Sequence, residues 1–339
     1  MPINHTICNA HGPRPRLRFA CRLGLGPTRK RKEEGSALIS ALFIMTLIAI
    51  AATAMSTRLQ FDIYRTRLTI SSDKLYLASQ AITFWAMDRL TDQKQRLTAH
   101  DTNGKLLDYP KQLQRIYPDV NIEGHLYDLQ ARFNLNNLQD KTFQIFFYGL
   151  LNHAFKKTDA SARRFIVDAT SNWINSYQPE RGRDTLSYRY TKQKPPYLPG
   201  YQPMQNVSEF RMVIGINAEL FQAISPYITA LPEVTPININ TAPKPLLMSL
   251  GNGLNPSQVS ELMDARGKKG FTNLAEVSPL LQKLNIPNEE VTTDSNYFLS
   301  VAITSTQDLT MTVYTILKRG KEKQGKVVVS IISESLNTV

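Results

Sequence analysis

The chain has 339 residues, enough to bury a sizeable core and to form two domains or one domain with a large insertion. Its formal net charge is +12, and half of this excess lies in residues 1–35, which hold eight Lys or Arg against two Glu. The rest of the chain is only modestly basic, which is weak support for a nucleic-acid partner. Both cysteines, Cys8 and Cys21, lie in the same leader, so the chain beyond it can form neither a disulfide nor a thiolate metal site.

A basic leader meets an apolar segment at Glu34-Gly35-Ser36. The run Arg29-Lys30-Arg31-Lys32 precedes this junction, and residues 36–55 contain no charge, no Pro and no Gly. A helix of this length, rising about 1.5 Å per residue, crosses a hydrocarbon core of roughly 30 Å. Basic residues before such a helix indicate a cytoplasmic N-terminus. We predict a cytoplasmic leader over residues 1–35 and a transmembrane helix over residues 36–56.

Three fates of this segment are compatible with its sequence. A Gly directly before an apolar helix is typical of type IV prepilins, in which the peptidase would cut between Gly35 and Ser36 and leave the helix on the mature chain. The second alternative is a secretory signal peptide cleaved after Ala52-Thr53-Ala54, and the third is an uncleaved anchor. The apolar stretch is longer than the h-region of a signal peptide, and helical periodicity resumes directly after it. We therefore favour cleavage before Ser36.

Cleavage at this place would make Ser40 the fifth residue of the mature chain. Pilin-like proteins usually carry Glu at this position. Its carboxylate is costly in lipid unless it meets a cation, which the N-terminal ammonium of a neighbouring subunit supplies. A subunit without the carboxylate needs no partner on that side, so Ser40 indicates a place at the end of a filament.

The helical pattern continues beyond the apolar segment. No Pro or Gly occurs from Ser36 to Asn103, and apolar residues recur at spacings of three and four, at Leu75, Ala78, Ile82 and Trp85. We predict one helix of about 60 residues that ends at Asp101-Thr102-Asn103-Gly104.

The rest of the chain alternates between strand and helix patterns. A strand is expected from Val120, and a helical region from Lys141 to about Ile174. The apolar face of that region is expected in the core and comprises Phe143, Phe146, Phe147, Leu150 and Leu151. A polar loop over residues 175–205 precedes a short helix that Ser208 would cap. The β-branched stretches Tyr297–Thr304, Leu309–Leu317 and Lys326–Ser333 predict a three-stranded antiparallel meander.

Several segments carry a resemblance to a known family through their order along the chain. They are the Gly35-Ser36 junction without Glu at Ser40, residues 128–138 (Asp-Leu-Gln-Ala-Arg-Phe-Asn-Leu-Asn-Asn-Leu), Asn172-Trp173-Ile174-Asn175, Pro195-Pro196-Tyr197, Ser208-Glu209-Phe210-Arg211 and residues 237–243 (Ile-Asn-Ile-Asn-Thr-Ala-Pro). The chain thereby resembles the minor pseudopilin K family of type II secretion systems, also called general secretion pathway protein K. The ordered set covers nearly the whole mature chain, although no single segment is specific.

The resemblance implies an α+β fold, in which a pilin-like long N-terminal helix packs on an antiparallel sheet and a large α-helical domain is inserted. Residues 57–137 would form the pilin-like helix and the first strands. Residues 138–289 would form the inserted helical domain, including a helix-hairpin-helix-like segment at 237–277. Residues 290–339 would supply the strands that complete the sheet.

The resemblance also implies a location and a role. The protein would cross the bacterial inner membrane once, with its N-terminus in the cytoplasm and its C-terminal domain in the periplasm. At the tip of a short pseudopilus it would bind the minor pseudopilins I and J, with H beneath. It would prime filament assembly, and filament growth would push folded proteins toward the outer-membrane channel. Prepilin peptidase, the inner-membrane assembly platform and membrane lipid are the further expected partners, and no nucleic acid is expected.

One cofactor is implied by the resemblance, a calcium ion. Family members resemble Asp-Trp-Ile-Asp-x-Asp followed by an acidic stretch, which suits a hard cation. The candidate ligands in this chain are Asn172, Asn175, Glu180 and Asp184. Amide oxygens bind calcium, but Arg181 and Arg183 would repel it. The alternative is a loop held by hydrogen bonds and aromatic packing.

The alternative function is DNA binding by a membrane-anchored or periplasmic protein of a competence or type IV pilus system. It depends on residues 239–266, which resemble a helix-hairpin-helix. Such hairpins use a Gly-apolar-Gly turn so that bare backbone N–H groups reach a phosphate. Here Asn255 replaces the second Gly. Lys268 and Lys269 could contact phosphate, but a charge pair at a helix end is usually only solvated.

Signals for catalysis are poor. The histidines beyond the leader, His100, His125 and His153, are widely spaced. The sequence has no His-Glu-x-x-His, no Gly-x-Ser-x-Gly and no phosphate-binding Gly loop. We therefore expect that the protein is not an enzyme.

Overall fold

The computed structural model describes residues 34–92, 97, 104–177, 185–321 and 325–337. The chain divides into two compact units between Tyr64 and Arg65. In the first unit the described part is helical throughout, and the other strands and helices named below belong to the second unit. The leader cysteines and His100 lie outside the described residues.

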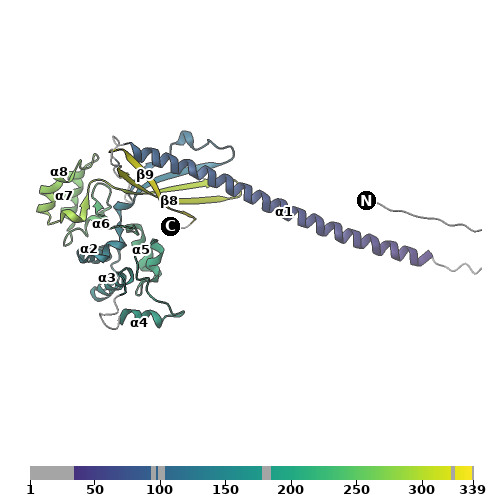
Figure 1. Ribbon diagram of the computed structural model, residues 1–339, viewed down its shortest axis with the longest axis horizontal. Coiled ribbons are helices and arrows are strands. Elements are labelled where there is room, and N and C mark those ends of the chain that lie inside the picture. Colours follow the sequence, from purple (N-terminus) through teal and green to yellow (C-terminus); the bar gives the residue numbers. More distant parts are fainter. Residues whose placement is uncertain (1–33, 93–96, 98–103, 178–184, 322–324, 338–339) are drawn as a thin grey trace, which may run out of the picture. The chain divides into compact units, whose positions relative to one another are not determined.

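The N-terminal helix is the longest element. Helix α1 runs from Glu34 to Thr91, 58 residues, and confirms the single long helix expected from the sequence (Figure 1). It ends earlier than expected, before Asp101-Thr102-Asn103, which lie outside the described part. The last turn contains Arg89, whose charge complements the negative end of the helix dipole.

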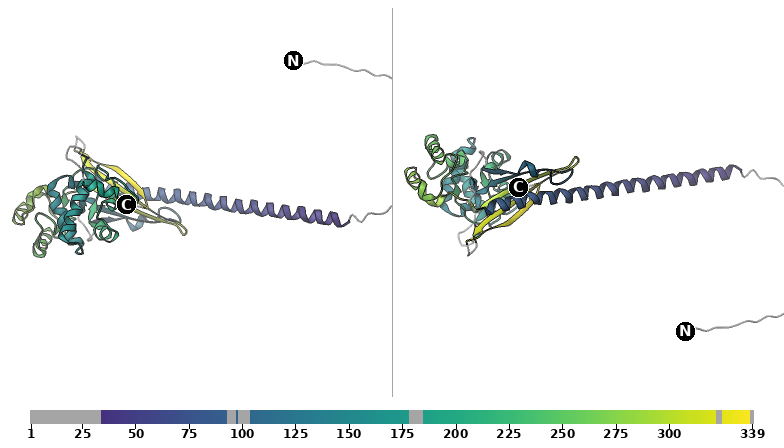
Figure 2. Two further views of the ribbon diagram at one scale, coloured as in Figure 1. Left: turned by 90° about the horizontal axis from the view of Figure 1, so that it is seen from below. Right: turned by 90° about the horizontal axis from the view of Figure 1, so that it is seen from above.

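The C-terminal part of α1 buries one face. Its fully buried residues follow the predicted spacing of three and four: Leu75, Ala78, Ile82, Ala86 and Leu90. Leu75, Ala78 and Ile82 form one apolar cluster with strand residues that include Ile122, Ala302 and Val313. The end of α1 lies alongside the yellow C-terminal strands in both figures of the whole chain (Figures 1 and 2).

The main sheet has five strands in the order β1-β2-β7-β8-β9, and all neighbours are antiparallel. The strands are β1 (Lys105–Asp108), β2 (Asn121–Asp128), β7 (Tyr297–Ser305), β8 (Thr310–Lys321) and β9 (Val327–Leu336). Strands β7, β8 and β9 confirm the predicted meander. Strand β2 joins it by pairing with β7. Even the partners nearest along the chain, Asp128 and Phe298, are 170 positions apart, so this pairing arises only in the tertiary structure.

A glycine sets how closely α1 approaches the sheet. A Cβ added at Gly124 in β2 would lie 2.7 Å from Cγ2 of Ile82. The bare backbone of this residue therefore gives room for the buried Ile82 side chain.

The segment between β2 and β7 is mostly helical. Its elements are η2 (Leu129–Ala131), β3 (Phe133–Asn134), η3 (Leu135–Gln139), α2 (Lys141–Ala154), α3 (Ala160–Ile174), α4 (Thr185–Thr191), η5 (Val207–Met212), α5 (Ala218–Ile224), η6 (Ser225–Tyr227), β4 (Ile228–Thr229), β5 (Ile237–Asn238), α6 (Lys244–Leu247), α7 (Pro256–Arg266), α8 (Leu274–Lys283), η7 (Asn288–Glu290) and β6 (Val291–Thr292). A further 3-10 turn, η1 (Lys111–Leu113), follows β1. Two short parallel pairs, β3 with β4 and β5 with β6, tie distant parts of this segment together.

The aromatic face predicted for the core is buried. Phe143, Phe146, Phe147, Leu150 and Leu151 of α2 are all buried in one large cluster. The rings of Phe146 and Phe147 stack on Phe133, with centroids 5.1 and 5.2 Å from it. These rings form the core of the helical segment.

One local prediction is confirmed and one is corrected. The helical region expected from Lys141 to about Ile174 is present as two helices, α2 and α3, because Asp159 starts a new one by accepting a hydrogen bond from Ala162 N at 2.7 Å. The predicted cap Ser208 lies inside η5, and the capping side chain is that of Asn206, which forms a capping box with Glu209. Asn206 accepts from Ser208 N at 2.7 Å, so the cap precedes the expected one by two residues.

Candidate functional site

Helix α1 is the described helix that is long and apolar enough to span a membrane. The large apolar side chains of residues 38–50 are exposed on it. Its hydroxyl groups are satisfied within the helix: Thr46 Oγ1 donates to Phe43 O at 2.7 Å and Thr53 Oγ1 to Ala49 O at 2.6 Å. Since lipid offers no hydrogen-bond partner, this internal pairing suits a membrane-spanning segment.

The candidate processing residues lie at the start of this helix. Gly35 and Ser36 are within the first turns of α1. Ser40 Oγ donates to Ser36 O at 2.9 Å, one helical turn back. The side chain at the fifth position after the junction is therefore satisfied by its own helix and is neutral.

A row of exposed apolar residues follows the C-terminal part of α1. Ile70, Leu77 and Phe84 recur every seven residues, and their exposed fractions are 63%, 60% and 65%. At about 100° per residue, they lie on the side of the helix opposite the buried Leu75 and Ala86. A seven-residue repeat of this kind is the pattern by which one helix packs along another. This row was not predicted from the sequence, although its seven-residue spacing is present there.

A buried carboxylate lies where the sheet meets the helical segment. Asp128 ends β2 and is 1% exposed. Its Oδ2 accepts hydrogen bonds from Thr241 Oγ1 at 2.5 Å, Ser295 Oγ at 2.7 Å and Asn238 Nδ2 at 3.0 Å. Its Oδ1 accepts from Gln130 N at 2.8 Å. Burial raises the pKa of Asp128, and these hydrogen bonds to the charged form act against that rise.

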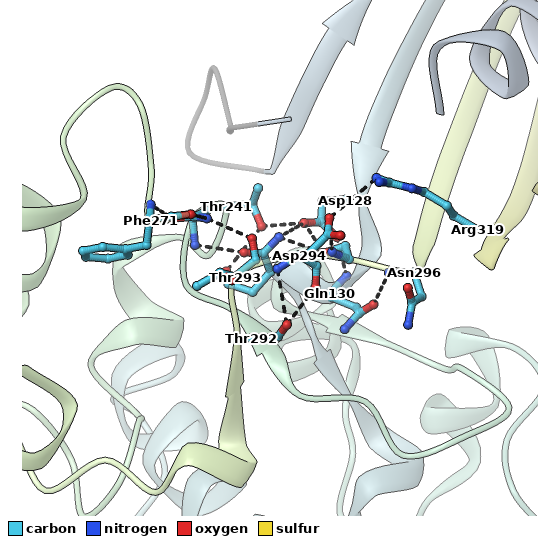
Figure 3. A network of polar contacts seen from close by, with 12 residues as sticks. Asp128, Gln130, Thr241, Phe271, Thr292, Thr293, Asp294, Asn296 and Arg319 are labelled. Carbon is cyan, nitrogen blue, oxygen red and sulfur yellow. Dashed lines mark hydrogen bonds and ion pairs between the residues drawn. The ribbon is translucent and has the colours of Figure 1, made fainter. Parts of the chain in front are cut away.

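Other polar residues continue this junction (Figure 3). Gln130 Nε2 donates to Pro236 O at 3.0 Å, and its Oε1 accepts from Asn296 N at 2.6 Å. Arg319 of β8 lies 3.6 Å from the carboxylate of Asp294. The network joins β2, β8 and the chain before β7 to the helical segment, so we assign it a structural role.

Three buried asparagines bind two loops of the helical segment. Asn136 Nδ2 donates to Met204 O and to Leu231 O, both at 2.8 Å, and its Oδ1 accepts from Met204 N at 2.8 Å. Asn134 Oδ1 accepts from Leu231 N at 3.0 Å. Asn137 exchanges two hydrogen bonds with the Thr235 backbone, at 2.7 and 3.0 Å. The buried side chains of Asn134, Asn136 and Asn137 therefore hold two loops in place and do not contact solvent.

The candidate calcium ligands are only partly described. Asn172 lies in the last turn of α3 and Asn175 follows it as the C-cap, whereas Glu180 and Asp184 lie outside the described residues. Asn175 Nδ2 donates to Ser171 O at 2.8 Å and to Ser171 Oγ at 3.1 Å. Within the described ranges no three His, Cys, Asp or Glu side chains gather as metal ligands would. The two described candidate ligands, Asn172 and Asn175, provide amide oxygens and no carboxylate. Amide oxygens without a carboxylate are a poor ligand set for calcium.

The helix-hairpin-helix-like turn uses its N–H groups internally. Gly253 N donates to Leu250 O at 3.0 Å, and Leu254 N donates to Met248 O at 2.9 Å. Asn255 N and Gln258 N are both bonded in a capping box, each at 2.9 Å. The intruding Asn255 is thus the N-cap of α7. Because these donors already have acceptors, the turn is not arranged to bind a phosphate.

The histidines of the described residues, His125 and His153, lie in separate elements. His125 in β2 has its Nδ1 2.6 Å from Asp108 Oδ1 in β1. His153 is in the last turn of α2, where burial lowers its pKa. The structure places them in different elements, and Asp108 of the His125–Asp108 pair also lies 3.2 Å from Lys105 Nζ.

Comparisons with known proteins agree on one family. Two models described as type II secretion system protein K match residues 131–233 and 237–298. Type II secretion system protein K of Klebsiella pneumoniae is 27% identical, with coverage of 74% of this chain and 81% of the relative. The protein of the same description from Pseudomonas aeruginosa is 24% identical, with coverage of 88% and 92%.

A solved structure shares the fold. The crystal structure of a GspK-GspI-GspJ complex from enterotoxigenic Escherichia coli contains a chain that matches with a TM-score of 0.65 and 20% identity. The match covers 81% of this chain and 100% of that one. It confirms the α+β fold expected from the sequence, with its long N-terminal helix and antiparallel sheet. On these matches and this fold, the chain belongs to the minor pseudopilin K family of type II secretion systems.

Proposed function

We propose that this protein is the tip subunit of a type II secretion pseudopilus. There it primes filament assembly, and growth of the filament pushes folded proteins toward the outer-membrane channel. The observation that carries the tip position is the neutral, internally bonded side chain of Ser40. Without a carboxylate at this depth, the helix needs no cation from a subunit above it.

The same proposal includes a topology. The basic leader would remain in the cytoplasm until prepilin peptidase cuts between Gly35 and Ser36. Helix α1 would then cross the inner membrane once, and the C-terminal part of the chain would lie in the periplasm. The exposed apolar side chains and the internally satisfied hydroxyls of residues 36–55 support contact with lipid.

The proposed partners are the minor pseudopilins I and J, with H beneath and the inner-membrane assembly platform at the base. The related GspK is found in a complex with GspI and GspJ. In this chain the row formed by Ile70, Leu77 and Phe84 has the spacing to pack along the N-terminal helix of such a partner. We therefore propose this row as the contact with I or J.

Co-purification of residues 57–339 with the I- and J-type partners of the same system tests the proposal. We expect a stable complex, and we expect Phe84→Asp to weaken it by tenfold or more, because a charge would enter an apolar seam. The matched control is Ile145→Asp on α2, since Ile145 is 60% exposed and lies outside the row. No complex at any salt concentration would count heavily against the tip role.

Three further proposals concern calcium, catalysis and nucleic acid. Calcium is proposed as a ligand of the loop that begins at Asn172, and a thermal melt at rising calcium concentration tests it. No stabilisation at millimolar calcium ends that proposal. We also propose that the protein has no catalytic activity and no nucleic-acid partner. A salt-dependent shift of duplex DNA by the chain would contradict the second point.

A further inference from the structure

A buried carboxylate lines a cavity in the helical segment. Glu290, the last residue of η7, is only 3% exposed. The cavity has a volume of about 460 Å³, which is within the range of sites that bind small ligands. Its walls come from the first turns of α2, from Gly251 and Asn252 of the helix-hairpin-helix-like turn, and from the end of α8 with the residues that follow it. Three separate parts of the chain therefore build this site.

One oxygen of the Glu290 carboxylate has a donor within the chain. Its Oε2 accepts a hydrogen bond from Gly251 N at 2.9 Å. Among the described residues, no hydrogen bond reaches Oε1 and no ion pair joins the carboxylate to a Lys, Arg or His. Burial raises the pKa of Glu290, the bond from Gly251 N acts against that rise, and the charge of Glu289 adds to it. A cation in the cavity would stabilise the charged form of this carboxylate.

The elements around the cavity also favour a cation. The last residues of α8 and those after it line the cavity, so the negative end of this helix dipole lies beside it. The basic residue in the last turn of α8, Lys283, pairs with Glu261 instead. On the other wall, Thr142 is in the first turn of α2, whose dipole has the opposite sign. There the carboxylate of Asp140 accepts from Thr142 N at 2.9 Å and offsets that positive end.

The remaining lining has two kinds of surface. Ile145 and Ile286 supply apolar side chains, and Asn252, Gln282 and Asn285 supply exposed amides at the rim. A metal ion would make no use of the apolar wall, and Glu290 is the only charged residue in the lining that the structure describes. A primary ammonium has three N–H donors and commonly sits on an apolar stem. The lining therefore suits an alkylammonium better than a metal ion.

We propose that this cavity binds a primary ammonium group at the end of an alkyl chain. The ammonium donates to Glu290 Oε1 and to amide oxygens at the rim, and the chain packs against Ile145 and Ile286. A lysine side chain of a partner protein and a free alkylamine share this chemistry. The site lies on elements other than α1 and does not depend on the proposed contact with I or J.

The test uses the full chain in lipid nanodiscs at pH 8, with carbon-13 in the δ1 methyl groups of Ile. The probes are n-butylamine and the blocked peptide acetyl-Gly-Lys-Gly-amide. We expect saturable shifts of the Ile145 and Ile286 methyl signals at millimolar probe. The neutral compound N-butylacetamide should cause none. Methylamine, which lacks the chain, should bind about threefold or more weakly than n-butylamine.

The two probes distinguish the sources of the ammonium group. Binding of the lysine peptide about tenfold or more tightly than n-butylamine identifies a protein side chain as the ligand. Similar affinities, or tighter binding of n-butylamine, identify a free amine.

Two substitutions of Glu provide a matched pair. Glu290→Gln should weaken binding of n-butylamine by about tenfold or more, because it removes the charge. Its amide oxygen can still accept from Gly251 N. Glu289→Gln is the control, since Glu289 is adjacent and exposed and does not line the cavity. It should weaken binding by less than about threefold. Asn252→Asp, which adds a carboxylate at the rim, should tighten binding and serves if Glu290→Gln does not fold.

Absence of saturable shifts with either amine at millimolar concentration overturns the proposal. Equal weakening by the substitutions at Glu290 and Glu289 would show that the amine responds to surface charge and not to this cavity, which also overturns it. Shifts confined to Ile methyl groups other than those of Ile145 and Ile286 would place the amine elsewhere, with the same consequence.

Discussion

Asp128 is the residue through which the end of strand β2 is bonded to the inserted helical segment. Its carboxylate accepts four hydrogen bonds, from Gln130 near the start of that segment, from Asn238 and Thr241 within it and from Ser295 near its end. A carboxylate suits this position because its two oxygens carry enough lone pairs to accept all of these hydrogen bonds. A buried charge is costly, however, so the side chain makes the junction sensitive to pH.

Replacement of Asp128 by Asn should change how stability depends on pH. Burial raises the pKa of Asp128, so the folded chain holds its proton more tightly than the unfolded chain. Its contribution to stability is then fully present below about pH 4 and is lost as the pH rises through the folded pKa. We expect Asp128→Asn to cost about 1–2 kcal/mol near pH 4, and to cost less as the pH rises. Urea unfolding of residues 57–339 at a series of pH values measures this.

Asp108→Asn is a control of opposite sign. Burial raises the pKa of Asp108, but hydrogen bonds from His125 and Lys105 outweigh that effect and hold it below its usual value. Its contribution is therefore present above about pH 4 and is lost as the pH falls. If both substitutions change the pH dependence in the same direction, the assignment for Asp128 is wrong.

Two glycines in the hairpin-like turn allow a second prediction. Gly251 has φ +58°, and a Cβ there would lie 2.6 Å from Asn285 O, whereas a Cβ at Gly253, with φ +92°, would meet nothing closer than Met248 O at 3.9 Å. Gly253→Ala should cost about 1 kcal/mol through backbone strain alone. Gly251→Ala should cost about 3 kcal/mol, because a backbone carbonyl must also move. Equal losses in urea unfolding would show that the close approach at Gly251 is unimportant.

At the scale of the elements, the packing of α1 on β2 depends on a matched pair, Ile82 and Gly124. Gly124→Ala should cost about 1–3 kcal/mol, because Ile82 has no room to move. Ile82→Ala should cost about 2–5 kcal/mol by leaving a cavity. In the double variant the new methyl group occupies part of that cavity, so the total should fall short of the sum by about 1 kcal/mol. Additive losses in urea unfolding would show that helix and strand do not meet at this pair.

The presence and type of an element were predicted well where a single periodic pattern continued, although α1 ends at Thr91 and not near Asp101. Boundaries were predicted poorly where a cap decided them. The 58 residues of α1 and the three strands of the meander follow directly from spacing. The helical region from Lys141 to about Ile174 was predicted without the position of the break between α2 and α3, because that break depends on the side chain of Asp159 and not on a Pro or Gly. Strand β1 was missed too, since four residues at a sheet edge carry little pattern.

At the scale of the whole molecule, the central prediction is where the chain is cut. If the peptidase cuts before Ser36, N-terminal sequencing of the mature protein should begin at Ser36. In the Gly35→Lys variant the chain should remain uncleaved, because the substitution removes the Gly that precedes the cleavage site. Ala54→Lys should leave that cut unchanged, since it disrupts only the alternative signal-peptide site. A mature chain that begins at Met55 would contradict the anchor.

By itself the sequence determined the α+β fold, the long helix with an apolar start, the C-terminal meander, and the order of motifs that indicated the family. These are local or periodic properties, which a chain expresses before it folds. Tertiary structure alone decided that Asp128 is buried at a junction, that the Asn-rich segment pins two loops, and that the buried Glu290 lines a cavity built from three separate parts of the chain. Each of these depends on residues about 70 to 170 positions apart meeting in space, because only folding determines which donors, acceptors and apolar surfaces become neighbours.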